Sequence, residues 1–213
     1  MEGGDLLTLI EGAGTTMILS VIAIGAAMPL GLGLALIRWA RLRPFDSVVA
    51  ILVSLLRATP MITLVLLVYF ALPTIGLSLP RFTAAVATLA LGSMAFNCEI
   101  WRGALLAFPK DQIDAAQAFG MTRTLRFRRI ILPQIWRFAL PALVNEMTLL
   151  IKVSPAVAVI GVVELTRAAV RVGASTYAPM PPFIVALALY LPIIGCFVWL
   201  QRILERRFGP VLT

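Results

Sequence analysis

Residues 110–133 read KDQIDAAQAFGMTRTLRFRRIILP, and this stretch carries the strongest signal in the chain. Its first half is rich in helix formers from Ile113 to Ala118. Gly120 follows them, and glycine readily adopts the left-handed conformation that ends a helix. Thr122 suits the cap of a second short helix, which we expect Pro133 to break. The stretch therefore predicts a helix-turn-helix that is too polar to cross a membrane.

The turn of this segment suits contact with another protein. Ala115 and Ala116 have little bulk, so a partner's surface can approach the backbone closely. Phe119 and Met121 flank Gly120 as apolar anchors, and a rigid turn transmits motion better than a flexible loop. Contact with anionic lipid is the alternative interpretation, and the basic composition of the segment by itself slightly favours it.

The composition of the whole chain indicates a lipid solvent. Of its 213 residues, 61% are hydrophobic and 13% are charged, whereas a soluble domain is about 25% charged. The net charge of +8 comes without a basic stripe interleaved with aromatics, so we expect no nucleic-acid partner. Histidine is absent, and Cys98 and Cys196 lie in apolar runs. We therefore predict two free buried thiols and no metal site.

Five stretches are long and apolar enough to cross a bilayer, which takes about 20 residues per helix. We predict an all-α integral membrane protein with a single domain over residues 1–213 and no internal repeat. The predicted spans are 15–37, 47–72 (interrupted by Arg57 and Pro60), 82–106, 138–163 and 183–204, with a polar loop over 107–137. Residues 164–181 are predicted to form a short interfacial helix, ended by Pro179, Pro181 and Pro182.

Basic residues predict the orientation, because Lys and Arg concentrate in cytoplasmic loops. The connections after the first and third spans and the C-terminal tail are basic; they hold Arg38, Arg41, Arg43, Arg102, Lys110, Arg123, Arg126, Arg128, Arg129, Arg137, Arg202, Arg206 and Arg207. The opposite side holds Arg81, Arg167 and Arg171. With five spans, these positions predict an external (periplasmic) N-terminus and a cytoplasmic C-terminus. The helix-turn-helix then lies in the cytoplasm.

The spacing within the quoted stretch resembles a known signature. An acidic residue and two alanines begin at Asp114, Gly120 follows after three intervening residues, and Ile130-x-Leu-Pro follows after nine more. This pattern resembles the EAA loop of type I ABC-importer permeases, with Asp114 in the place where that family usually has Glu. The resemblance favours subunit docking over lipid contact. It implies docking of an ATPase by Asp114, Ala115, Ala116, Phe119, Gly120 and Met121.

Other segments resemble the polar amino acid permeases within that family, and together they cover nearly the whole chain. The matching segments are Gly14-Thr15-Thr16, Arg57-Ala58-Thr59-Pro60, Glu99-Ile100-Trp101-Arg102-Gly103, Leu132-Pro133-Gln134, Pro141, Asn145-Glu146, Lys152, Gly161 and Glu164-Leu165-Thr166. The chain departs from the pattern at Lys152-Val153-Ser154-Pro155-Ala156 and at Gly92–Phe96. These departures leave open an opine or another modified amino acid as the substrate.

Four charged residues fall within or near the predicted spans: Arg57, Glu99, Glu146 and Lys152. A charge at the bilayer centre costs about 3 kcal/mol or more, so it should face the bundle interior or a water-filled path. Glu99 could pair with Arg102, one helical turn away, or with Arg57 across helices. If it does not, it is a candidate for the translocation path.

The fourth span carries a polar face. Asn145, Thr148 and Lys152 share one side of a helix, and Glu146 lies about 100° around from Asn145. An amino acid zwitterion needs an anion for its ammonium and a cation for its carboxylate, which Glu146 and Lys152 could supply. A structural ion pair is the alternative. The predicted substrate path comprises Asn97, Glu99, Asn145, Glu146, Thr148, Lys152 and Ser154.

The resemblance also implies partners in a bacterial inner membrane. A second permease, identical or homologous, would complete a central path, and two ATPases would dock on the loops. A periplasmic solute-binding protein would deliver substrate near residues 73–81 and 164–181. ATP and Mg²⁺ would bind the ATPases, because this chain has no G-x-x-x-x-G-K-[ST] loop. We expect no cofactor, no metal and no catalytic residue here.

Two other functions compete with this one. An ion-coupled secondary transporter would work without an ATPase, and internal repeats would favour it. A non-transporting membrane scaffold would explain the turn at Asp114–Met121, called the docking turn below, but not the polar face of the fourth span.

Overall fold

The computed structural model describes residues 3–208, and every regular element within that range is helical. The α-helices are α1 (Gly3–Trp39), α2 (Phe45–Ala58), α3 (Met61–Ala71), α4 (Arg81–Leu106), α5 (Lys110–Ala118), α6 (Arg123–Arg126), α7 (Leu132–Val153), α8 (Leu165–Thr176) and α9 (Met180–Phe208). Two 3-10 helices, η1 (Leu72–Ile75) and η3 (Ser154–Ile160), follow α3 and α7, and η2 (Phe127–Ile131) is a π-helical turn.

The membrane-spanning elements agree with the predicted fold class. Four helical stretches are individually long and apolar enough to cross a bilayer: α1, α4, the run from Arg123 to Ile160, and α9. The bent pair of α2 and α3 supplies a fifth. The prediction of an all-α membrane protein with about five spans is confirmed, although α1 begins at Gly3 rather than near Thr15.

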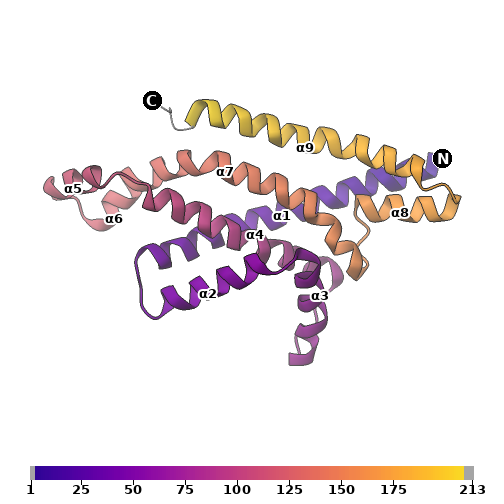
Figure 1. Ribbon diagram of the computed structural model, residues 1–213, viewed down its shortest axis with the longest axis horizontal. Coiled ribbons are helices and arrows are strands. Elements are labelled where there is room, and N and C mark those ends of the chain that lie inside the picture. The colour runs from indigo at the N-terminus through magenta and orange to yellow at the C-terminus, as the bar shows by residue number, and fades with distance from the viewer. Residues whose placement is uncertain (1–2, 209–213) are drawn as a thin grey trace.

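The long helices run along one axis of the molecule and place the short ones at its two ends (Figure 1). Helices α5 and α6 lie at one end, together with the last turn of α1 and the end of α9. The N-terminus and α8 lie at the opposite end, and α3 projects sideways from the bundle.

The second predicted span is sharply broken at Pro60, where an interruption was predicted. The α2 and α3 axes differ by 112°. Thr59 lies between them with an extended backbone, as expected for a residue before proline, and Pro60 precedes the first turn of α3. The amide and Oγ1 of Thr59 both donate to the carbonyl of Leu55, at 3.1 and 2.8 Å, which closes the end of α2. Arg57 and Thr59 therefore lie at a corner of the backbone.

Pro133 does not break a helix, so that prediction is wrong. The chain stays helical from Arg123 through the π-helical turn into α7, and Pro133 occupies the first turn of α7. Proline is tolerated in the first turn of α7, where its φ angle is already helical. Within the π-helical turn, the Leu132 amide donates to the carbonyl of Phe127, five residues earlier. The docking turn is thus joined to a span by continuous helix.

The fourth span and the short helix predicted after it also differ from prediction. α7 ends at Val153, and the chain tightens into η3 where Pro155 lacks an amide donor. α8 ends at Thr176, before Tyr177 with φ +53°. Pro181 and Pro182 lie in the first turn of α9, so they begin the next helix and do not end α8.

Small residues let α1 pack closely along α4. The buried side of α1 presents Ala23, Ala27, Gly31 and Ala35, spaced four apart on one face. At Gly31 the two backbones approach so closely that an added Cβ would lie 2.7 Å from Asn97 Cβ. Close approach over small residues is the usual mode of helix packing in lipid, so the α1–α4 pair forms the centre of the bundle.

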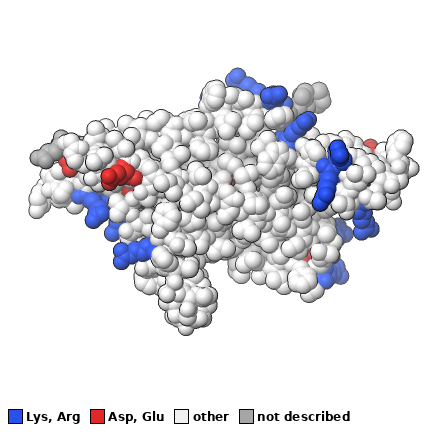
Figure 2. All heavy atoms as spheres, turned by 180° about the vertical axis from the view of Figure 1, so that it is seen from behind, with Lys and Arg blue, Asp and Glu red and all other residues white. Residues whose placement is uncertain are grey.

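The outer surface between the two ends is apolar. In Figure 2 the Lys and Arg side chains gather toward the ends of the molecule, and the middle of that face is white. Exposed apolar side chains on α2 and α9 include Val48, Ile51, Leu55, Leu187, Leu191 and Trp199. Both cysteines are free as predicted; Cys98 is buried, but Cys196 is exposed on α9, which corrects the prediction of two buried thiols.

Candidate functional site

The docking turn has the backbone geometry that its sequence predicts. Gly120 has φ +72°, in the left-handed region. Its amide donates to Gln117 at 2.9 Å, and the Met121 amide donates to Ala116 at 3.1 Å, which closes the end of α5. Thr122 caps α6, because its hydroxyl accepts from the Leu125 amide at 3.3 Å.

The six predicted docking residues do not all face outward. Phe119 is 89% exposed, and Asp114, Ala115 and Gly120 are exposed with it. Met121 is half-buried, and Ala116 is only 4% exposed. Of the two predicted apolar anchors, Phe119 is therefore the one that is fully available at the surface of this chain.

The turn is held to the bundle on both sides. Gln134 of α7 donates to Gln112 of α5 at 2.8 Å, and Arg126 donates to Gln117 at 3.4 Å. Ile113 packs against the hydrophobic core cluster that contains Leu105 and Ile131. A force on the turn is therefore passed to α7 through direct contacts.

Glu99 belongs to an ion network near the C-terminal end of α4. Its carboxylate accepts from Arg102 at 2.7 and 2.9 Å and from Arg38 of α1, and Arg38 Nε lies 3.8 Å from Asp46 of α2. The predicted pairing with Arg102 is present, and the pairing with Arg57 is not. Both carboxylate oxygens of Glu99 are thus engaged in tying α1, α2 and α4 together.

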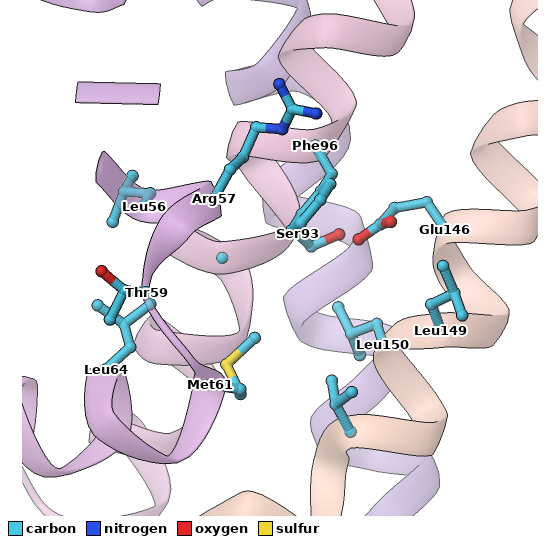
Figure 3. A pocket seen from close by; sticks show the side chains of 12 residues that line it. Leu56, Arg57, Thr59, Met61, Leu64, Ser93, Phe96, Glu146, Leu149 and Leu150 are labelled. Carbon is cyan, nitrogen blue, oxygen red and sulfur yellow. The ribbon is translucent and has the colours of Figure 1, made fainter. Parts of the chain in front are cut away.

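A cavity of about 280 Å³ lies at the broken span, between α2, α3, α4 and α7. Glu146 of α7 is 8% exposed and points toward the Ser93 hydroxyl of α4 (Figure 3). Arg57 stands at the rim, with its guanidinium carbon 5.3 Å from the centre of the Phe96 ring. The remaining wall is mostly apolar and includes Leu56, Met61, Leu64, Leu149, Leu150 and Val153.

Two opposite charges line this cavity without neutralising each other. Within residues 3–208, no nitrogen of Arg57 lies within 4.0 Å of a Glu146 oxygen. Burying a carboxylate without a close cation is costly in an apolar surrounding. The arrangement suits a small zwitterion, whose ammonium and carboxylate would each meet an opposite charge.

The other residues of the predicted substrate path do not line this cavity. Asn145 and Lys152 are exposed on another face of α7. Thr148 and Ser154 are buried and donate to the carbonyls of Val144 and Ile151. Asn97 is buried, with its Nδ2 3.5 Å from Ser93 Oγ.

The structure therefore brings Arg57, rather than Lys152, to the cavity that holds Glu146. Sequence reasoning missed this role of Arg57 and Ser93. The available signal was a charged residue beside a proline within an apolar span, because a helix break in a membrane occurs where the backbone lines a cavity.

The fold defines a class of protein, a multi-pass helical membrane protein with a helix-turn-helix at one end. The chain belongs to the family described as binding-protein-dependent transport system inner membrane component, whose model matches residues 27–210. It is therefore a permease subunit of ABC transporters and resides in the inner membrane as a multi-pass protein.

Several curated relatives are similar over nearly their full length. The arginine transport system permease ArtQ of Bacillus subtilis is 33% identical, covering 93% of this chain and 91% of ArtQ. The glutamine permease GlnP of Escherichia coli is 34% identical, with 93% and 92% covered. The octopine permease OccM of Rhizobium radiobacter is 33% identical, with 96% and 87% covered.

Solved structures support the same fold. A chain from a crystal structure titled as an amino acid ABC transporter with histidines has a TM-score of 0.85 and 34% identity, and each chain is 94% covered. The inward-facing MetNI methionine transporter has a TM-score of 0.77 at 21% identity, covering 97% of this chain and 99% of the MetNI chain, which supports the fold alone.

Proposed function

We propose that this chain moves a polar amino acid or an amino-acid derivative, such as an opine, across the inner membrane in an ATP-driven importer. Relatives named for arginine, glutamine and octopine transport support the substrate class. The observation that carries the proposal is the cavity at the α2–α3 corner, which buried Glu146 and exposed Arg57 both line without forming an ion pair. In this cavity, Glu146 would bind the ammonium of the substrate and Arg57 would bind its carboxylate.

The docking turn would couple this cavity to ATP hydrolysis on separate subunits, where ATP and Mg²⁺ would bind. Phe119 and the exposed face of α5 would enter a groove of the ATPase. Continuous helix from α6 into α7 supports the coupling, because Glu146 lies on the same helical run as the turn. A displacement of the turn would therefore shift one wall of the cavity.

Two further partners complete the proposed importer. A second permease, identical or homologous, would pack along the apolar outer surface and the projecting α3. A solute-binding protein would dock at the opposite end from the turn. Arg81 packs against Gly161 there, so the start of α4 adjoins the segment before α8. In this arrangement the N-terminus is periplasmic and the C-terminus is cytoplasmic.

Reconstitution with the ATPase and binding protein tests the substrate site. In proteoliposomes, E146Q should reduce substrate-stimulated ATP hydrolysis by at least about tenfold, as expected for one lost charge-assisted bond. Basal hydrolysis should persist, which shows that the docked complex is intact. E205Q, which removes an exposed carboxylate of α9, is the matched control.

A second pair of variants separates the two candidate cations. R57Q should lower substrate-stimulated ATP hydrolysis as E146Q does. K152Q should leave this hydrolysis near the level of the unmodified protein. The reverse result would assign the carboxylate to Lys152 and reject the cavity. Uptake driven by an ion gradient without ATP would instead favour a secondary transporter.

A further inference from the structure

A second groove lies at the cytoplasmic end of the molecule, away from the cavity that holds Glu146. It has a volume of about 600 Å³ and lies between the last turn of α1 and the segment from α6 to η2. Trp39 and Phe127 form an aromatic pair there, with ring centroids 6.3 Å apart. Leu36 and Leu42 make the wall apolar, and Arg123 and Arg126 bring two guanidinium groups to it.

The positive charge of this groove is not neutralised by the chain itself. Within residues 3–208, neither Arg123 nor Arg126 has a carboxylate oxygen within 4.0 Å. Arg126 has a long bond to Gln117, and Arg123 is exposed. By contrast, Arg38 and Arg102 nearby share the carboxylate of Glu99. The groove therefore offers two free cations beside an apolar wall.

The groove also lies at the level of a membrane surface. Trp39 is the last residue of α1, one of the spanning helices, and tryptophan concentrates at the boundary between lipid and water. The turns of α1 that precede Trp39 are apolar, and Leu42, just after α1, is 52% exposed. A ligand in this groove would have its anionic group among the arginines and its apolar part against leucine and aromatic side chains.

We propose that this groove binds the headgroup of an anionic phospholipid of the inner leaflet. A lipid phosphate accepts hydrogen bonds from two guanidinium groups, and acyl chains cover the apolar wall. The bond between Arg126 and Gln117 links the groove to α5, so the bound lipid supports the docking turn from the membrane side.

Fluorescence quenching in nanodiscs tests the proposal. The permease–ATPase complex is placed in phosphatidylcholine nanodiscs that contain phosphatidylglycerol brominated near the top of its acyl chains. Bromine quenches tryptophan on contact, so phosphatidylglycerol should quench more than equally brominated phosphatidylcholine. W39F should abolish this excess, which assigns it to Trp39 among the four tryptophans of the chain.

Charge variants connect the excess quenching to the groove. R123Q/R126Q should weaken the phosphatidylglycerol preference by at least about fivefold, and R123K/R126K should restore part of it. R206Q/R207Q, which removes two basic residues from the end of α9, should leave it unchanged. Equal quenching by the two lipids would reject the proposal. A preference that appears only without the ATPase would also reject it, because the groove would then belong to the ATPase.

Discussion

Glu164, which lies in one of the segments that resemble the polar amino acid permeases, is a fully buried carboxylate with several hydrogen-bond partners. Its side chain caps α8 by accepting from the amides of Thr166 at 2.9 Å and Arg167 at 2.7 Å. The Tyr190 hydroxyl of α9 donates to it at 3.1 Å. A negative charge at a helix N-terminus is favourable in itself. Glu164 therefore fixes α8 and joins it to α9.

Replacement of Glu164 should destabilise the chain without touching the substrate cavity. E164A removes both carboxylate oxygens and leaves the amides of Thr166 and Arg167 without their acceptor, so the free energy of unfolding should fall by about 2 kcal/mol. Thermal unfolding in detergent measures the loss, with E205A as the exposed control. An unchanged melting temperature for E164A would show that water replaces the carboxylate, against a structural role.

Helix packing depends on individual glycines of α1. A Cβ at Gly31 would lie 2.7 Å from Asn97 Cβ and 3.0 Å from the Met94 carbonyl oxygen and the Cys98 nitrogen. Two of these neighbours are backbone atoms, which cannot move aside as a flexible side chain can. Gly33, two residues on, has open space around it.

These two glycines make a matched pair of variants. G31A should lower the free energy of unfolding by about 1–3 kcal/mol, because α1 and α4 must separate. G33A should be neutral or slightly stabilising, because alanine favours a helix over glycine. Thermal unfolding of the two variants side by side distinguishes a packing effect from a general effect of alanine in α1. Equal destabilisation of both would contradict the close contact.

The docking turn depends on the backbone of Gly120 rather than on space around it. No atom lies within 4 Å of a Cβ built at this position, but its φ of +72° strains most side chains. G120V should therefore distort the turn and release the ATPase during co-purification. G120N should retain it, because asparagine tolerates the left-handed region. Binding of the ATPase to G120V at the unmodified level would disprove docking through this turn.

At the scale of the molecule, the two ends differ in what they expose. Phe119 marks the end with the docking turn, and Tyr177, 95% exposed, marks the end with α8. In a variant without native cysteines, Y177C should react with a membrane-impermeant maleimide on intact spheroplasts. F119C should react only after permeabilisation. The opposite labelling pattern would invert the proposed orientation.

Local features of the sequence were enough to predict much of this protein. Apolar length specifies the spans, because lipid requires a continuous helix of sufficient length. Gly120 and Thr122 specify the docking turn through their own backbone and capping preferences, and the structure confirms both. Helix periodicity also predicted that Glu99 could meet Arg102, one turn away.

The composition of the substrate cavity was decided only by the tertiary structure. Periodicity along one helix grouped Glu146 with Lys152, but it cannot say which neighbouring helix faces either side chain. The 112° bend after Ala58 carries Arg57 to the cavity that Glu146 lines, and Ser93 arrives from α4. A bend angle depends on how three helices pack, whereas a turn or a cap depends on a few adjacent residues. The docking turn could therefore be predicted from a few adjacent residues, whereas the partners of Glu146 depend on contacts between helices that are distant in the sequence.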